Sequence, residues 1–319
     1  MEGTVRKKAM IKEKMINFAP IIGLILVIAV FAILTGGKSI SKVNLKIITN
    51  QFVMTALVSI GMVYCFSCGA LDMSASGSLC ISAISGALVG TKTGSFAAMI
   101  IVTVLVSLGI ALIKGVLAAY LTLPIFIVTI ILGALLSAIG LVLLGNETTI
   151  SVRKMININN MTAINLTFVI CFYIVALVIF NYTRIGKGCK LQGGNALASA
   201  QAGINAKWNV IVAFLMSGVG IALAAIITIL KTKTVTASSG GSIGNDILLA
   251  IVLGGMPLTG GSRSKISAAL IGAATITILN NGLSICNVSN DMIQIVRGII
   301  FIVVVFITSM TYRTKLLPR

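Results

Sequence analysis

The sequence predicts an all-α protein, a polytopic transmembrane helical bundle of about 8–10 spans with broken or re-entrant helices. Of its 319 residues, 58% are hydrophobic and only 9% are charged, whereas about 25% of the residues of a soluble domain are charged. Apolar runs of the length that crosses a bilayer, about 20 residues, recur along the whole chain. These two observations exclude an ordinary soluble protein.

Eight apolar runs are long enough to be membrane spans. A leading basic stretch without an A-x-A cleavage site marks the first as a helix and not a signal peptide. Two further runs, 79–89 and 247–258, are too short to cross comfortably and adjoin glycine clusters. They count either as crossings, which gives ten spans, or as re-entrant hairpins. The eight long runs are 18–35, 51–68, 95–120, 125–144, 163–182, 208–230, 266–283 and 292–311.

The charge distribution predicts the orientation. Lys114 and Arg297 fall within apolar runs. Of the other 22 basic residues, eight lie outside and 14 inside if there are ten spans and the N-terminus is inside. The positive-inside rule therefore places both termini in the cytoplasm. The outer eight are Lys38, Lys42, Lys46, Lys92, Arg153, Lys154, Lys231 and Lys233.

This orientation divides the chain into a cytoplasmic N-terminal tail (1–17), a single transmembrane domain (18–311) with a cytoplasmic loop at 183–207, and a cytoplasmic C-terminal tail (312–319). No stretch is long enough for a soluble nucleotide-hydrolysing domain. No nucleic-acid partner is expected, because the basic residues are spread over short loops and not clustered on a soluble face.

The side chains needed for catalysis or metal binding are scarce. The chain has no histidine, and its six cysteines are scattered. Cys65 and Cys68 form a C-x-x-C, but it lies inside an apolar run, which favours packing over metal or redox chemistry. We therefore expect no catalytic residue, no metal and no cofactor in this chain.

The two short runs carry the polar residues of interest. Residues 68–90 and 244–273 each combine glycines, hydroxyl residues and an acid, Asp72 or Asp246. Non-helical backbone at membrane depth must be buried in protein or line a watery cavity, and broken helices are typical of transporters. Asp72 is either functional or, with Ser74, the cap of a helix starting near residue 79, and Asp246 is interpreted as a cap. The shared GS…ISA…GA pattern indicates an internal repeat or merely small-residue composition.

Two other polar features stand out. The adjacent amides of Asn280 and Asn281 can bind a hydroxyl-rich ligand or hydrogen-bond between helices. The stretch GGNALASAQAGIN, 193–205, is small and polar. It predicts a short cytoplasmic helix capped by Asn195 and ended by Gly203, with Leu197, Gln201 and Ile204 on one face.

Four stretches resemble the ribose-type sugar permeases of ABC transporters, within the ribose and branched-chain amino acid permease superfamily. They occur in the family's order between residues 50 and 310. Each stretch alone is weak evidence for the family, because all four are rich in small residues. The four together, in the family's order, are specific. They are LDMSASGS (71–78), PIFIVTIILGALLSAIGLVLL (from Pro124), RIGKGCKLQGGNALASAQAGIN (184–205) and LLAIVLGGMPLTGGSRSKISAALIGAATITILNNGLSI (248–285).

The resemblance implies a transport subunit and not an enzyme, in the bacterial cytoplasmic (inner) membrane. It implies three protein partners besides membrane lipid: an ABC ATPase subunit that holds the ATP, an extracytoplasmic sugar-binding protein, and a second permease copy or paralogue. The helix at 193–205 becomes the coupling helix that docks on the ATPase. Its contact residues are Gly194, Asn195, Leu197, Ala198, Ser199, Gln201, Gly203 and Ile204.

We expect the substrate path to pass near Asp72, Ser74, Asn280 and Asn281, and the solute to be a ribose-type sugar, with nucleosides and autoinducer-2 left open. Ala196 and Ala200 stand where many relatives carry Glu and Arg, so a contact with the ATPase rests on shape more than on salt bridges. Two rivals remain, an ATP-independent secondary transporter or channel and an intramembrane enzyme. The first is disfavoured because no charged relay is evident in the spans, and the second because no catalytic set is.

Overall fold

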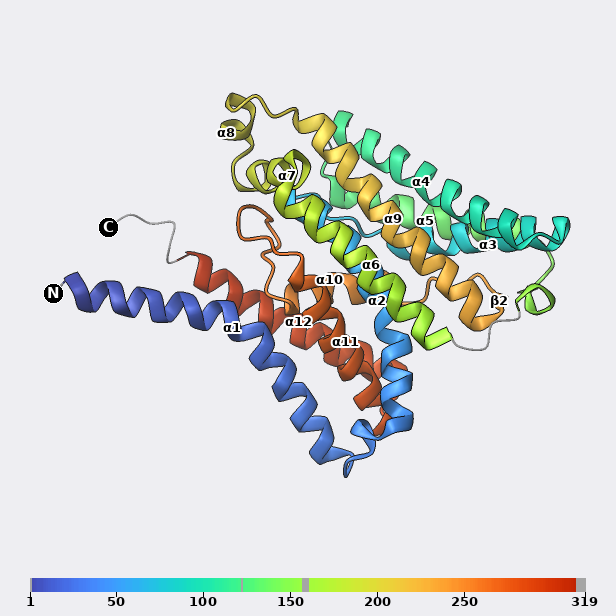
Figure 1. Cartoon of the computed structure of the whole chain (residues 1–319), viewed down its shortest axis with the longest axis horizontal. Helices are drawn as coiled ribbons and strands as arrows, with labels where there is room; N and C mark the ends of the chain where they lie inside the picture. The colour runs from blue at the N-terminus through green and yellow to red at the C-terminus, as the bar shows by residue number, and fades with distance from the viewer. Residues whose placement is uncertain (1, 122, 157–160, 314–319) are drawn as a thin grey trace.

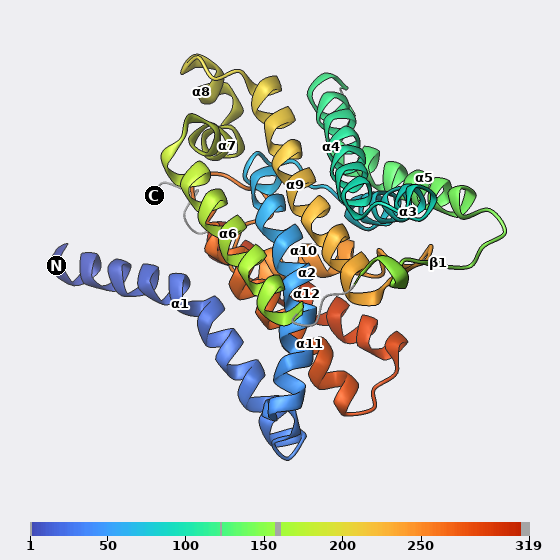
Figure 2. The same ribbon diagram turned by 45° about the vertical axis from the view of Figure 1, so that its right-hand side comes forward.

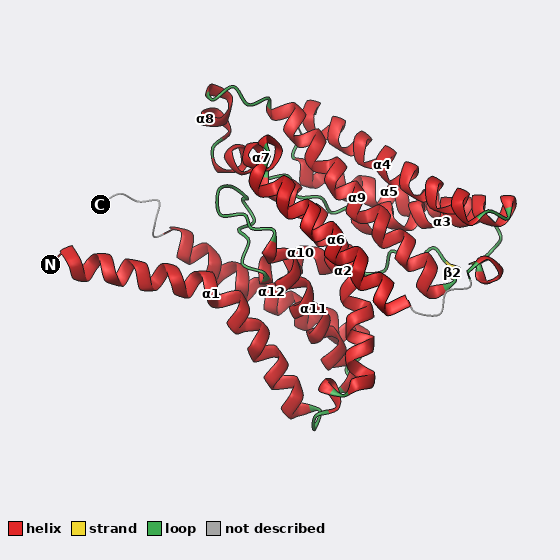
Figure 3. Cartoon of the chain, viewed as in Figure 1, coloured by secondary structure: helices red, strands yellow, loops and turns green. Residues whose placement is uncertain are grey.

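The chain folds as a bundle of helices with almost no strand, which confirms the predicted all-α class (Figures 1 and 3). In this computed structural model, residues 2–121, 123–156 and 161–313 are described. Short strands β1 (Ile150–Ser151) and β2 (Thr234–Val235) pair antiparallel. The helices are α1 Glu2–Leu34, α2 Lys42–Ser67, α3 Ala75–Thr93, α4 Phe96–Tyr120, α5 Ile125–Leu144, α6 Met161–Tyr182, α7 Arg184–Gly194, α8 Ala196–Gln201, α9 Ala206–Thr232, α10 Ile243–Leu253, α11 Ser267–Ile285 and α12 Asn290–Arg313.

Six helices in the described part of the chain are long and apolar enough to cross a membrane: α2, α4, α5, α6, α9 and α11. The apolar part of α1, Phe18–Leu34, is shorter, and so is α10. Helix α1 continues back through the predicted N-terminal tail, and the predicted C-terminal tail lies outside the described residues beyond Arg313. The predicted run 247–258 ends early, because the chain leaves the helix at Gly254 and takes a left-handed φ of +85° at Gly255.

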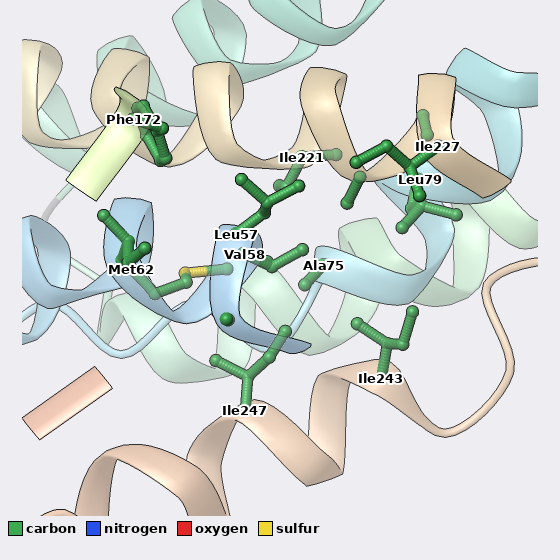
Figure 4. Close-up of a cluster of buried hydrophobic side chains, with 14 of the residues drawn as sticks. Leu57, Val58, Met62, Ala75, Leu79, Phe172, Ile221, Ile227, Ile243 and Ile247 are labelled. Carbon is green, nitrogen blue, oxygen red and sulfur yellow. The ribbon is translucent and has the colours of Figure 1, made fainter. Parts of the chain in front are cut away.

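Helix α2 is the centre of the core. Its side chains Leu57, Val58 and Met62 are buried against α3, α6, α9 and α10 (Figure 4). Helix α9 lies antiparallel to it at very close range, because a side chain on Gly61 would overlap the backbone of Met216 and one on Gly220 would overlap that of Leu57. Small residues permit this approach, as in other membrane helix pairs.

The chain is organised as two halves of opposite direction, α2–α5 and α9–α12. Each half has a long helix, an irregular segment, a helix that follows it (α3 or α10) and two further helices. Helix α10 is short, with 11 residues, whereas α3 has 19 and extends beyond the predicted short run 79–89 at both ends. The packing is reciprocal: α3 and α4 pack on α9, while α10 and α11 pack on α2. Because α2 and α9 are antiparallel, the halves are inverted relative to each other, an arrangement frequent in transporters.

This topology decides between the two interpretations of the GS…ISA…GA pattern. The pattern aligns residues of α3 with the start of α11, whereas the halves pair α3 with α10. The two halves therefore repeat in their arrangement of helices, and the residues shared in the GS…ISA…GA pattern reflect small-residue composition.

Helices α3 and α10, which contain the two predicted short runs, belong to segments that cross the bundle and are not hairpins that return. The irregular segment before α3 leaves α2 at Ser67, which lies beside Gly193 of α7, and α3 ends near Met155, at the end that carries β1 and β2. The segment of α10 runs the opposite way, from β2 to a loop in which Gly261 donates to the backbone oxygen of Ser67. The order of the ends agrees with ten crossings, with α7 and α8 at one end of the bundle (Figure 2).

Glycines at the tight contacts make the fold testable. A side chain on Gly272 of α11 would overlap the backbone oxygen of Ala250 in α10, whereas one on the exposed Gly109 of α4 would meet nothing within 4 Å. We expect Gly272→Ala to lower the free energy of unfolding by about 1–3 kcal/mol, the usual cost of overpacking. The matched Gly109→Ala should leave thermal stability in detergent unchanged or slightly raised. Equal effects of the two substitutions would contradict this packing of α10 on α11.

Candidate functional site

The irregular segment before α3 is held by a buried ion pair. Lys114 of α4 is only 2% exposed, and its Nζ lies 2.7 Å from Asp72 Oδ2 and donates to Ser78 Oγ at 3.2 Å. The same ammonium lies 5.9 Å from the centre of the Phe214 ring. A buried charge is tolerated only when it is paired and hydrogen-bonded, and Lys114 meets this condition.

Asp72 also organises the backbone of this segment. Its Oδ1 accepts hydrogen bonds from the backbone N of Ser74 at 2.9 Å and from Ser74 Oγ at 2.6 Å. Thr129 of α5 accepts from the backbone N of Met73 at 3.2 Å. These bonds satisfy non-helical backbone that hydrocarbon would leave unpaired.

The predicted cap near residue 79 is wrong. Helix α3 begins four residues earlier, at Ala75, and Ser74 occupies the N-cap position without a side-chain cap bond. Asp72 instead lies two residues before the N-cap residue and fixes the turn that leads into the helix. Sequence reasoning missed its partner because Lys114 lies 42 residues away and looked like an isolated charge within a span.

A polar cavity of about 270 Å³ lies between the C-terminal part of α9 and helices α2, α10, α11 and α12. It includes Lys231, Ser284 and Asn290, which stand at or near helix ends remote from α7 and α8. Ten of its thirteen lining residues are polar or charged. Such a lining suits a ligand rich in hydroxyl groups, which both donate and accept hydrogen bonds.

The four predicted path residues fall into two groups. Asn280 and Asn281 both line this cavity, whereas Asp72 and Ser74 do not and instead lie with Lys114. The two asparagines differ in what they bind. Asn281 accepts from Asn44 Nδ2 at 2.8 Å and so ties α11 to α2, while Asn280 accepts from Arg297 Nε at 2.6 Å.

The cavity contains a second ion pair. Arg297 Nη1 of α12 lies 2.9 Å from Asp246 Oδ1 of α10. The expected role of Asp246 as a cap is wrong, because Ser242 is the N-cap residue and donates from Oγ to Asp246 Oδ2 at 3.1 Å. A lone arginine within one apolar run and a lone acid just before another were the available signal, but only the fold brings them together.

The predicted coupling helix is present as α8. Asn195 caps it, accepting from the backbone N of Ala198 at 3.1 Å, and Gly203 follows it with a left-handed φ of +75°. Leu197 is 71% exposed, and Asn195, Ala198 and Gln201 are also exposed. An exposed leucine on a short capped helix is available to a partner.

Two of the predicted contact residues do not lie on that exposed surface. Ser199 is buried, and Ile204 is half-buried after the helix has ended. The prediction of one face formed by Leu197, Gln201 and Ile204 is therefore wrong for Ile204. A six-residue helix is too short to project a third residue onto the same face.

Helix α7, which the sequence predicted only as a basic loop, connects α8 to the bundle. A side chain on Gly193 would overlap the backbone oxygen of Ser67, and one on Gly261 would lie 3.1 Å from the Cα of Gly194. Gly261 also donates to the Ser67 oxygen at 3.1 Å. The end of α7 thus contacts both the end of α2 and the loop after α10, where the two broken segments meet this end of the bundle.

The buried pair predicts an asymmetric mutational response. Asp72→Asn leaves the Lys114 ammonium buried without its carboxylate, so we expect the free energy of unfolding to fall by about 3–5 kcal/mol. The double variant Asp72→Asn/Lys114→Met removes both charges and should recover most of that loss. Thermal unfolding in detergent, followed by Trp208 fluorescence, measures both. A double variant as unstable as the single one would contradict the pairing.

Comparison with known proteins supplies the family. The chain is 26% identical to the ribose import permease of Escherichia coli (strain K12) over 276 residues, which cover 83% of this chain and 85% of that protein. It is 26% identical to the D-allose transport system permease (86% of each chain) and 26% identical to the galactofuranose transporter permease (83% and 79%) of the same organism. No solved structure matches significantly. The family described as the branched-chain amino acid transport system permease component matches residues 44–305. Because this match spans well over half of the chain, the protein belongs to that family of permease components.

Proposed function

We propose that the chain is the permease subunit of an ATP-binding-cassette importer that moves a sugar or sugar-like solute inward, with ATP hydrolysed on a separate chain. The observation that carries this proposal is the position of α8. It presents an exposed leucine at one end of the bundle, while the polar cavity lies among helix ends remote from it. A membrane subunit driven by a cytoplasmic ATPase requires this separation of docking surface and solute site.

The orientation follows from charge. The end that carries α7 and α8 holds the greater number of basic residues under the ten-span topology, so the positive-inside rule places it in the cytoplasm together with both termini. The cavity then faces the extracytoplasmic side. A solute delivered by an extracytoplasmic binding protein would meet the cavity first.

Several features support a sugar in preference to an amino acid. The relatives named above are permeases for ribose, allose and galactofuranose. The cavity is lined mainly by amides and hydroxyls, together with the Asp246–Arg297 ion pair and one further cation, Lys231. In the proposed path, Asn280 binds the solute within the cavity, and Asn281 forms part of the cavity wall. Asp72 and Ser74 are proposed to support the path by holding the broken segment in place. Nucleosides and autoinducer-2 remain the alternative solutes.

The proposed partners are the ATPase at α8, a sugar-binding protein at the opposite end, and a second copy or paralogue within the membrane. On α8 the proposed ATPase contacts are the exposed members of the predicted set: Gly194, Asn195, Leu197, Ala198, Gln201 and Gly203. Ser199 and Ile204 would support the helix from beneath. Movement of α8 would pass through Gly193 and Gly194 to Ser67 and Gly261, and so to both broken segments.

The two intramembrane ion pairs favour a second candidate, an ion-coupled secondary transporter. Acids and bases inside the membrane frequently mark proton or ion pathways. Here the Asp72–Lys114 and Asp246–Arg297 pairs belong to different halves and share no residue, which disfavours a continuous relay. Uptake driven by an ion gradient without any ATPase would support this candidate over ours.

The coupling role is tested by capture of the ATPase. We expect the intact chain, co-expressed with the ATPase encoded beside it, to retain that ATPase during purification in detergent. Leu197→Asp places a charge where an exposed leucine would be buried and should reduce capture by at least about tenfold, since a central hot-spot residue contributes roughly 2 kcal/mol or more. The readout is the ratio of ATPase to permease in the eluate.

Ile40→Asp is the matched control, because Ile40 is an exposed aliphatic residue (53%) at the opposite end of the bundle. It should capture the ATPase as the intact chain does. Equal capture by the Leu197→Asp chain would move the contact away from α8, and failure of the intact chain to capture any ATPase would overturn the importer proposal.

A further inference from the structure

A second cavity, of about 530 Å³, lies between α10 and α12 next to the first. Its lining includes Ser242, Asn245 and Gln294 together with the apolar Leu248 and Phe301. Among the residues that line the two cavities, Arg297 alone lines both. The side chain of Arg297 is therefore the partition between them.

Arg297 is held in that position by three groups from two helices. Its Nε donates to Asn280 Oδ1 of α11, and its Nη1 lies 2.9 Å from Asp246 Oδ1 and 3.4 Å from Ser242 Oγ on the α10 side. A guanidinium has five N–H donors, and these contacts use only Nε and Nη1. Nη2 is left for a ligand as far as the described residues go.

The carboxylate of Asp246 is likewise incompletely used. Asp246 is only 8% exposed, yet among the described residues its Oδ1 accepts no well-aligned hydrogen bond, despite the short distance to Nη1. A carboxylate oxygen has two lone pairs, so Oδ1 can accept a further hydrogen bond while its ion pair with Arg297 is kept. An acceptor with spare capacity and a donor with spare capacity thus face the same cavity.

We propose that Asp246, Arg297 and Asn280 form a binding site for the vicinal hydroxyls of a neutral polyol such as a sugar, and that the polyol passes from the first cavity to the second by replacing the contacts that hold Arg297. A hydroxyl can donate to the carboxylate and accept from the guanidinium at once. Adjacent hydroxyls can therefore insert between the carboxylate and the guanidinium, and each charged group keeps a hydrogen-bond partner. This inference rests on the proposed function and adds the site to it.

A zwitterionic amino acid is the alternative ligand, because its carboxylate and ammonium could each take one member of the pair. It would have to replace an existing ion pair with two new ones. The other polar residues of the first cavity, such as Gln51, Thr55 and Thr277, match further hydroxyls and not an aliphatic side chain. The geometry therefore favours the polyol.

The experiment measures binding to the purified full-length chain in detergent by saturation-transfer-difference NMR, with D-ribose, D-allose and L-leucine as probes. We expect saturable transfer to at least one of the sugars and none to leucine. Arg297→Lys keeps the charge but loses the planar fork, and should weaken sugar binding about tenfold, the effect of losing one hydrogen bond to a charged group. Arg153→Lys, an exposed arginine that lines neither cavity, is the matched control and should bind as the intact chain does.

Removal of one charge could unfold the protein, so the double variant Asp246→Asn/Arg297→Gln removes both charges and keeps a polar pair. Capture of the ATPase at α8 reports that this variant is folded, independently of sugar binding. A folded double variant that has lost sugar binding supports the site. Three results would overturn the assignment: unchanged sugar binding in this double variant, transfer to neither sugar in the intact chain, or binding of leucine that depends on Arg297. Failure of the intact chain to capture the ATPase would instead count against the proposed function alone.

Discussion

Breaking a helix inside a membrane exposes backbone N–H and C=O groups that hydrocarbon cannot satisfy, and this protein does so in both of its halves. In the first half, side chains meet part of this cost. Before α3, Asp72 and Thr129 bind the irregular backbone, and Lys114 neutralises the acid. At the start of α10, Asp246 is bound by Ser242 and paired with Arg297; these contacts join side chains and tie α10 to α12. The path that we propose runs beside these two polar clusters.

The clusters are alike in chemistry but differ in setting. The Asp72–Lys114 pair is almost completely buried, which suits a fixed structural support. The Asp246–Arg297 pair lies beside two cavities and retains unused hydrogen-bonding capacity, which suits a ligand that comes and goes. An importer must release its solute, so a site whose resting partners can take the solute's place is well suited to weak, transient binding.

The inverted halves explain how one cytoplasmic element could act on both broken segments. Because the halves run in opposite directions, the irregular segment of the first begins at the α7 end, and the loop that follows the short helix of the second returns to that end. Ser67 and Gly261 therefore meet, and the glycines at the end of α7 are small enough to contact both. No long connection between the halves is required.

The features set by local sequence could be predicted, and those set by long-range contacts could not. The apolar runs located the helices because bilayer thickness fixes their length, and Asn195 and Gly203 defined α8 because capping involves only near neighbours. The partners of Asp72 and Asp246 lie 42 and 51 residues away, and no local pattern indicates them. Likewise, the burial of Ser199 and Ile204 depends on how the segment that contains α8 packs on neighbouring helices such as α7 and α9, which the α8 segment alone does not specify.

Uptake into proteoliposomes tests the central claim most directly. The vesicles would contain this chain with the proposed ATPase and binding-protein partners, and the readout would be accumulation of labelled D-ribose or D-allose. The account predicts accumulation only when ATP is present on the side of α8 and the binding protein on the opposite side, and its loss in Leu197→Asp. Accumulation of the sugar by the permease alone, driven by an ion gradient in the absence of ATP, would contradict it.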